Sequence, residues 1–170
     1  MGYLWVADRI NDSVDEIDPT TNGIVATIPV GRGPEALAIG GSYVWVINAV
    51  DHSLMRIDPK TRIPGGAIAL DFAPNAIAAD ATGVWVAGAT ANRVAHIDPN
   101  GALITTVPVQ AGPEGLAIFS GYVWVADGTA RTVERINAAR AQVAGSLSVH
   151  GEPTAITASP DGSIWVTVSS

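Results

Sequence analysis

The sequence contains no cysteine among its 170 residues. A disulfide framework, a thiolate metal site and a cysteine nucleophile are therefore excluded, and the redox environment of the protein stays open. Charged residues are also scarce, at 15%, whereas a typical globular domain has about 25%. Because 48% of the residues are hydrophobic, a disordered chain is excluded too, since disorder requires low hydrophobicity and high charge.

Basic residues and long apolar runs are lacking as well. The 9 Lys and Arg residues are outnumbered by 16 Asp and Glu, for a formal net charge of −7. This balance argues against nucleic acid or a membrane surface as a partner. No apolar run approaches the roughly 20 residues that a spanning helix needs. Met1–Asp8 has no basic segment followed by an apolar one, so we expect no signal peptide and, by default, a cytoplasmic protein.

The sequence is rich in turn-forming residues, with 18 Gly and 11 Pro. Its five tryptophans are spaced by 40, 40, 39 and 41 residues, and each lies in a word such as Val-Trp-Val-Ala: Trp5, Trp45, Trp85, Trp124 and Trp165. A second motif, Ile-Asp-Pro, recurs at the same spacing at residues 17–19, 57–59 and 97–99, with a degenerate copy, Ile-Asn-Ala, at 136–138. A third word begins at Pro34, Pro74, Pro113 and Pro153. Three motifs that recur at the same spacing indicate an internal repeat.

Each period holds four short apolar runs, A to D, that are separated by turn residues. In one period these runs are Ala76–Ala79, Val84–Ala87, Val94–Ile97 and Ile104–Val109. They are rich in Val, Ile, Trp and Thr, as strands prefer, and none has a helical period of useful length. Run B is apolar at consecutive positions, which predicts a strand buried on both faces, with the tryptophans in the core.

Four-stranded units that repeat every 40 residues are typical of a β-propeller. A four-stranded sheet cannot bury both apolar faces alone, whereas sheets stacked around an axis can. Run A is rich in alanine, as expected for the strand nearest the axis, and its larger residues should wedge between blades. We therefore expect one all-β propeller domain over 1–170, with repeats at approximately 1–40, 41–80, 81–119 and 120–160 and a partial repeat at 161–170.

The words Trp-Val-Ala, Ile-Asp-Pro-x-Thr and Ile-Pro-Val-Gly-x-Gly-Pro-Glu resemble YVTN/NHL-type propeller repeats and those of streptogramin (virginiamycin B) lyase relatives. The resemblance covers essentially the whole chain and is specific for the fold. It implies six to eight blades in a closed ring. The lyases use histidines and a glutamate with magnesium at the channel mouth, and their histidine follows the proline of a Glu-Gly-Pro-His word. No histidine follows the matching prolines of this chain.

The number of strands poses a question of assembly. The chain begins and ends with a run B, at Tyr3–Ala7 and Ile164–Val168, so 17 strands are expected, whereas four closed blades need 16. We favour an eight-bladed homodimer of two half-rings, in which Met1–Ala7 and Ile164–Val168 compete for one place. The alternatives are a four-bladed monomer and an excised or engineered fragment without a function of its own.

Antiparallel order places the D–A and B–C loops on one rim and the A–B and C–D loops on the other. The Asp-Pro words are C–D turns, which we interpret as structural, because aspartate caps such turns. On the first rim, one residue after each proline should reach the channel mouth, and the B–C loops add polar residues that could recognise a ligand. The predicted ligand-binding rim comprises Glu35, Asn75, Glu114, Thr154, Asp8, Asp12, Asn48, His52 and Asp127.

Two kinds of chemistry are possible at this rim. Glu35 and Glu114 are candidates for a divalent cation, although carboxylates without a dense cluster are a weak metal signal, so no cofactor is our main expectation. His150 and Glu152 are the His/Glu couple closest in sequence on this rim and are the candidate acid/base pair. His96 should lie on the surface.

The even repeats favour a non-catalytic binding or scaffold module that assembles with itself and binds an unknown ligand or protein. The alternative function is a streptogramin lyase-like or other metal-assisted enzyme at the channel mouth.

Overall fold

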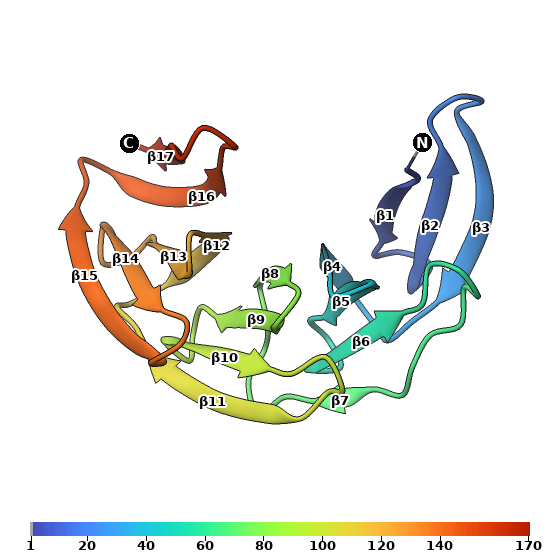
Figure 1. Cartoon of the computed structure of the whole chain (residues 1–170), viewed down its shortest axis with the longest axis horizontal. Helices are drawn as coiled ribbons and strands as arrows, with labels where there is room; N and C mark the ends of the chain where they lie inside the picture. Colours follow the sequence, from blue (N-terminus) through green and yellow to red (C-terminus); the bar gives the residue numbers. More distant parts are fainter. Residues whose placement is uncertain (1) are drawn as a thin grey trace.

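A computed structural model of the chain describes residues 2–170 and shows five antiparallel sheets that follow one another along an open arc (Figure 1). The expected 17 strands are present. Each sheet is one blade, and strand positions are called A to D from the inside of the arc to the outside. The expected first repeat begins at Met1, which lies outside the described residues.

Three blades are complete and follow the order A-B-C-D. The first comprises β4 (Pro34–Gly40), β5 (Tyr43–Asn48), β6 (Ser53–Ile57) and β7 (Ile68–Ala69). The second comprises β8 (Ala76–Asp80), β9 (Gly83–Gly88), β10 (Arg93–Ile97) and β11 (Leu103–Pro108). The third comprises β12 (Pro113–Phe119), β13 (Tyr122–Asp127), β14 (Thr132–Asn137) and β15 (Gln142–Ser148).

The sheets at the two ends of the arc are partial (Figure 1). The N-terminal sheet has positions B, C and D, which are β1 (Leu4–Asp8), β2 (Ser13–Asp18) and β3 (Gly23–Pro29). The C-terminal sheet has positions A and B, which are β16 (Glu152–Ala158) and β17 (Ile164–Ser169). Together the two partial sheets contain every strand of one blade, with position B present twice.

The hydrophobic core lies between the blades. Trp45 of β5 packs against Val84 and Val86 of β9, and Trp85 of β9 packs in turn against the corresponding valines of β13. Each of these tryptophans therefore faces the next blade, and the residues that flank a tryptophan face the previous one. This arrangement confirms that strand B is buried on both faces in the first two complete blades, whereas in the third Trp124 is only half-buried.

Two expectations about burial are wrong. Trp165 is 66% exposed, because β17 has no blade beyond it in this chain (Figure 1). His96, expected on the surface, is only 8% exposed. It lies opposite Trp85 on the neighbouring strand and stacks on the indole, with ring centroids 4.1 Å apart. Burial lowers the pKa of His96, so this ring packs as a neutral aromatic group.

The C–D turns have the expected structural role. Asp18, Asp58 and Asp98 each accept a backbone N–H two residues further on, at 2.7 to 2.8 Å. Asp98 accepts a second bond from the Ala102 N–H. These bonds explain why aspartate recurs at this point of the repeat.

None of the elements described for residues 2–170 is a helix that is long and apolar enough to cross a membrane.

Candidate functional site

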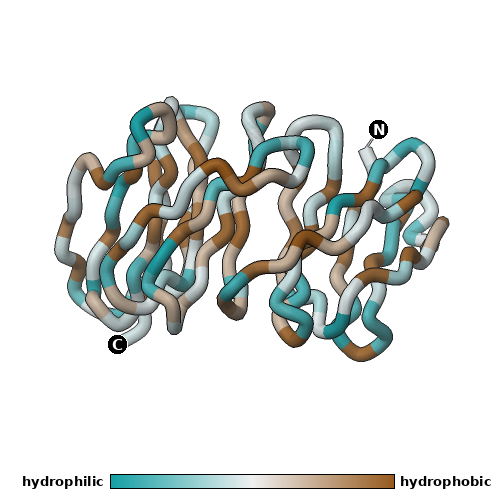
Figure 2. The backbone as a smooth tube through the Cα atoms, turned by 90° about the horizontal axis from the view of Figure 1, so that it is seen from below, coloured by the Kyte–Doolittle hydropathy of each residue, from teal (hydrophilic) through white to brown (hydrophobic). Residues whose placement is uncertain are grey.

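The rim that the sequence predicts to bind a ligand, called the recognition rim below, is the edge of the arc formed by the B–C and D–A turns. Figure 2 shows the chain turning back along both edges of the arc. A repeated backbone bond joins the two kinds of turn. The N–H of Val30 donates to the carbonyl of Asp12, and the equivalent bonds join Leu70 to His52, Val109 to Asn92 and Val149 to Arg131. The four acceptor residues all have a φ between 48° and 57°. The backbone of this rim is therefore fixed and repeats from blade to blade.

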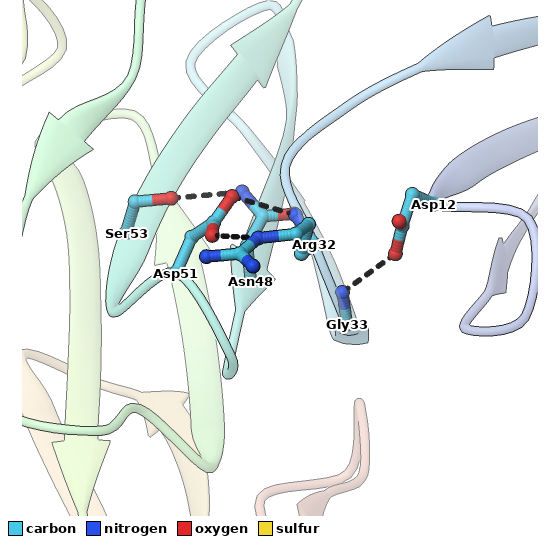
Figure 3. A network of polar contacts seen from close by, with 6 residues as sticks. All are labelled: Asp12, Arg32, Gly33, Asn48, Asp51 and Ser53. Carbon is cyan, nitrogen blue, oxygen red and sulfur yellow. Dashed lines mark hydrogen bonds and ion pairs between the residues drawn. The ribbon is translucent and has the colours of Figure 1, made fainter.

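Polar side chains strengthen the same junctions. The Asp12 carboxylate accepts the N–H of Gly33 at 2.8 Å (Figure 3), and Asn92 accepts the N–H of Gly112 at 3.0 Å. Both glycines have a positive φ, and a Cβ on Gly33 would lie 2.6 Å from Val50. Asp12, predicted from sequence as a ligand-binding residue, thus also holds two turns together.

A β-bulge follows the proline at the start of three strands. The register skips one residue between Pro34 and Ala36, and it skips again after Pro113 and Pro153. The skipped residues are Glu35, Glu114 and Thr154, whose side chains are exposed. A bulge turns a side chain away from the regular ladder, and this is how predicted rim residues reach solvent.

The same position differs in the remaining blade. Asn75 precedes β8, donates to the carbonyl of Pro113 at 2.8 Å and accepts the N–H of Ala89 at 2.9 Å. Because its amide is engaged at both ends, Asn75 links neighbouring blades.

Exposed ion pairs recur along the rim. Arg9 lies 3.6 Å from Glu35, and Arg131 lies 3.7 Å from Glu152. The other pairs are Arg32–Asp51 at 2.6 Å (Figure 3) and Arg93–Asp71 at 2.8 Å. The predicted site carboxylates Glu35 and Glu152 therefore each lie beside an arginine from a neighbouring turn. The rim presents both signs of charge.

The remaining predicted residues have separate roles. Asp8 accepts the N–H groups of Ile10 and Asn11 and the Asn11 amide, and the Asn11 bonds lower the pKa of Asp8. His52 and His150 are exposed on their turns. His150 lies two residues before Glu152, whose carboxylate faces Arg131. Within residues 2–170, no three His, Asp or Glu side chains are close enough together to hold a metal ion.

Two predicted loop residues are instead buried ends of strand B. Asn48 and Asp127 are both 0% exposed, so the expectation that they lie in solvated loops is wrong. The Asn48 amide donates to the Ser53 hydroxyl at 3.2 Å (Figure 3). At the equivalent place, Asp127 accepts the Thr132 hydroxyl at 3.3 Å. Strand B runs one residue further than the apolar run seen in the sequence. Side chains alternate along a strand, so this last residue lies on the same face as the residues that flank the tryptophan, toward the previous blade.

Asp127 shares its buried face with a second carboxylate, Glu134, which is 4% exposed and accepts the N–H of Gln110 at 2.9 Å. The Oδ1 atom of Asp127 has no hydrogen-bond partner among the described residues. Burial, and then the negative charge of Glu134, raise the pKa of Asp127 to about 8. Sequence reasoning missed Glu134, and the one signal for it was a charged residue at a position of run C that is apolar in two other repeats, at Met55 and Ala95.

The hollows of the structure lie between the strands. One, of about 240 Å³, opens on the last complete blade and is lined by Trp124, Val133, Arg135, Gly145, Ser146 and Leu147. Another, of about 230 Å³, lies where the short strand β7 leaves β10 and β11 uncovered. The first of these is where the C-terminal sheet lacks its positions C and D.

No protein-family model and no curated protein sequence matches this chain. Solved structures do match. Hydrazine synthase of Kuenenia stuttgartiensis is 22% identical with a TM-score of 0.91, and the alignment covers 98% of this chain and 52% of that one. Virginiamycin B lyase from Staphylococcus aureus is 19% identical with a TM-score of 0.84 (98% and 60%). A streptogramin B lyase structure is 18% identical with a TM-score of 0.83 (98% and 58%).

The chain thus spans between 52% and 60% of the length of these structures. At such identities the likeness concerns the fold alone. The sheet order and these matches show that the chain has an all-β, streptogramin lyase-like β-propeller fold.

Proposed function

We propose that the chain is a non-catalytic binding or scaffold module of YVTN/NHL-type repeats, in which two copies form an eight-bladed ring. The recognition rim is the surface that binds the ligand or partner protein. No nucleic acid, membrane or cofactor takes part.

The observation that carries this proposal is the contrast on the rim between a constant backbone and variable side chains. The same backbone bond holds the turns in four places. The side chains that project from these turns differ from blade to blade, and they include arginines, carboxylates and histidines. A rigid frame that displays varied polar groups suits recognition.

The arrangement of the candidate catalytic groups also favours binding. Glu152 faces Arg131 rather than a histidine, and Glu35 faces Arg9. The arginines beside Glu35 and Glu152 compete with a cation for the oxygens of these two carboxylates. The lyase-like alternative would need Glu35 and Glu114 to hold a divalent ion, with His150 and Glu152 as acid and base.

One experiment compares partner capture by three forms of the protein. The rim variant carries Glu35→Gln and Glu114→Gln, and the control carries Lys60→Gln and Arg140→Gln in exposed C–D turns of the opposite rim. We expect the wild type and the control to retain a common partner, identified by mass spectrometry, that the rim variant loses. Capture that is unaffected by the rim variant would contradict the proposal.

Calorimetric titration with MgCl₂ separates the two classes of function. A binding module shows no saturable heat. Binding of Mg²⁺ that disappears in Glu114→Ala would instead support the metal-assisted enzyme.

A further inference from the structure

The two ends of the arc present complementary surfaces. In the complete blades, the residues that flank the tryptophan of strand B are buried, as Val44 and Val46 are at 1% and 0% exposure. The corresponding residues of β1, Leu4 and Val6, are 56% and 45% exposed. They form an apolar face of the type that elsewhere receives the tryptophan of the preceding blade.

The opposite end of the arc offers that tryptophan. Trp124 lines the open hollow of about 240 Å³ and is half-buried, whereas Trp45 and Trp85 are 1% and 0% exposed. Strands B and C of the following blade lie next to Trp45, whereas the sheet that follows Trp124 has β17 at position B and no strand at position C. A blade with Leu4 and Val6 on its face therefore fits this hollow.

A polar contact supports the same match. Arg56 lies over the ring of Tyr43 and donates to the carbonyl of Pro99 in the next blade. Arg135 is at the equivalent point of its blade, lies over Tyr122 in the same way and lines the hollow. The repeat equivalent of Pro99 in the N-terminal sheet is Pro19. Arg135 of one copy thus has an acceptor, the Pro19 carbonyl, in the N-terminal sheet of another.

The sequences of β1 and β17 decide between the two candidates for position B. In two of the three complete blades, the residue opposite the first proline is polar, because Pro34 lies opposite Asn48 and Pro113 lies opposite Asp127. In the C-terminal sheet, Pro153 lies opposite Val168. The four residues of β1 from Trp5 to Asp8 are identical to those of β13 from Trp124 to Asp127, whereas β17 reads Trp-Val-Thr-Val. Strand β1 therefore restores the polar residue opposite proline, and β17 does not.

We propose that β16 of one copy pairs with β1 of a second copy and so completes a composite blade, with β17 displaced from position B. Two such blades, one at each junction, close the ring of two chains. This inference rests on the two-chain assembly proposed above and adds the strand that closes it. Following the register of β12 with β13, Ala155 lies opposite Ala7 of the second copy.

Disulfide trapping tests the pairing, and the absence of native cysteine gives it a clean background. Two single variants, one chain with Ala7→Cys and another chain with Ala155→Cys, are co-expressed and oxidised. Because the two cysteines are on different chains, a disulfide between them reports contact between copies. We expect a covalent heterodimer on a non-reducing gel.

The control is the double variant Ala155→Cys/Thr167→Cys. These two positions lie opposite each other where β16 pairs with β17 of the same chain. We expect it to keep free thiols, because β17 is displaced. If this control forms its disulfide while the protein still has the mass of two chains, the assembly stands and the exchange of strands is refuted. If the protein has the mass of one chain, the assembly itself fails.

Discussion

Replacement of Asp127 by asparagine tests the electrostatics of the buried carboxylate. In the folded chain Asp127 has a pKa of about 8, against 3.8 for an ordinary aspartate. Its folded pKa is raised, so between these values the folded state holds a proton that the unfolded state has released. Stability is therefore lost as the pH rises, by about 1.4 kcal/mol per pH unit.

The magnitude follows from this slope. Between pH 5 and pH 7 the wild type should lose about 2–3 kcal/mol of unfolding free energy through this group. Asparagine has the shape of the protonated carboxyl and no charge to desolvate, and Asn48 already fills the equivalent place. Asp127→Asn should therefore raise the unfolding free energy at pH 7 by up to about 4 kcal/mol, and by little near pH 4.

The assay is urea unfolding followed by tryptophan fluorescence at pH 5, 6 and 7, at one protein concentration. The difference between variant and wild type removes the pH dependence of all other groups. Asp98→Asn is the matched control of opposite sign, because hydrogen bonds lower the pKa of Asp98; this variant should lose stability at pH 7. A difference for Asp127→Asn that does not grow with pH would refute the reasoning.

Three further substitutions have defined outcomes. Val6→Asp should convert a two-chain assembly to single chains, measured by light scattering, whereas Ile10→Asp on an exposed turn should not; dissociation by both would count against the apolar end face. Below about pH 6.5 the wild type should lose unfolding free energy, because the unfolded histidine binds a proton that the buried His96 ring resists. His96→Gln should remove this loss, and an unchanged dependence of the unfolding free energy on acid pH, measured with urea, would contradict this. Gly112→Ala should destabilise by roughly 1–3 kcal/mol, since its Cβ would lie 2.5 Å from the Thr129 Oγ1 at a positive φ; a neutral result by thermal unfolding would be at odds with the close contact.

The four-stranded repeat could be predicted from the sequence because the features that produce it lie within each repeat. A tryptophan every 40 residues must be buried between sheets, and an aspartate before proline caps a turn whatever lies beyond it. The strand order and the Asp18, Asp58 and Asp98 turns follow from these two facts.

The remaining features depend on contacts between blades, which spacing does not encode. Burial of His96 requires the position opposite a tryptophan to face the next blade, and a polar residue alone suggests the reverse. Asp127 is buried because strand B runs one residue further than its apolar run, beside Glu134, which accepts the Gln110 N–H of the preceding turn. The bulges that expose Glu35 and Glu114 are register changes of one residue, which a hydrophobic pattern does not specify.

The solution mass tests the central claim most directly. Size exclusion with light scattering on the 170-residue chain measures it without any substitution. The account predicts a single species at twice 17.4 kDa, with two composite blades. A species of 17.4 kDa that persists across the concentration range would contradict it.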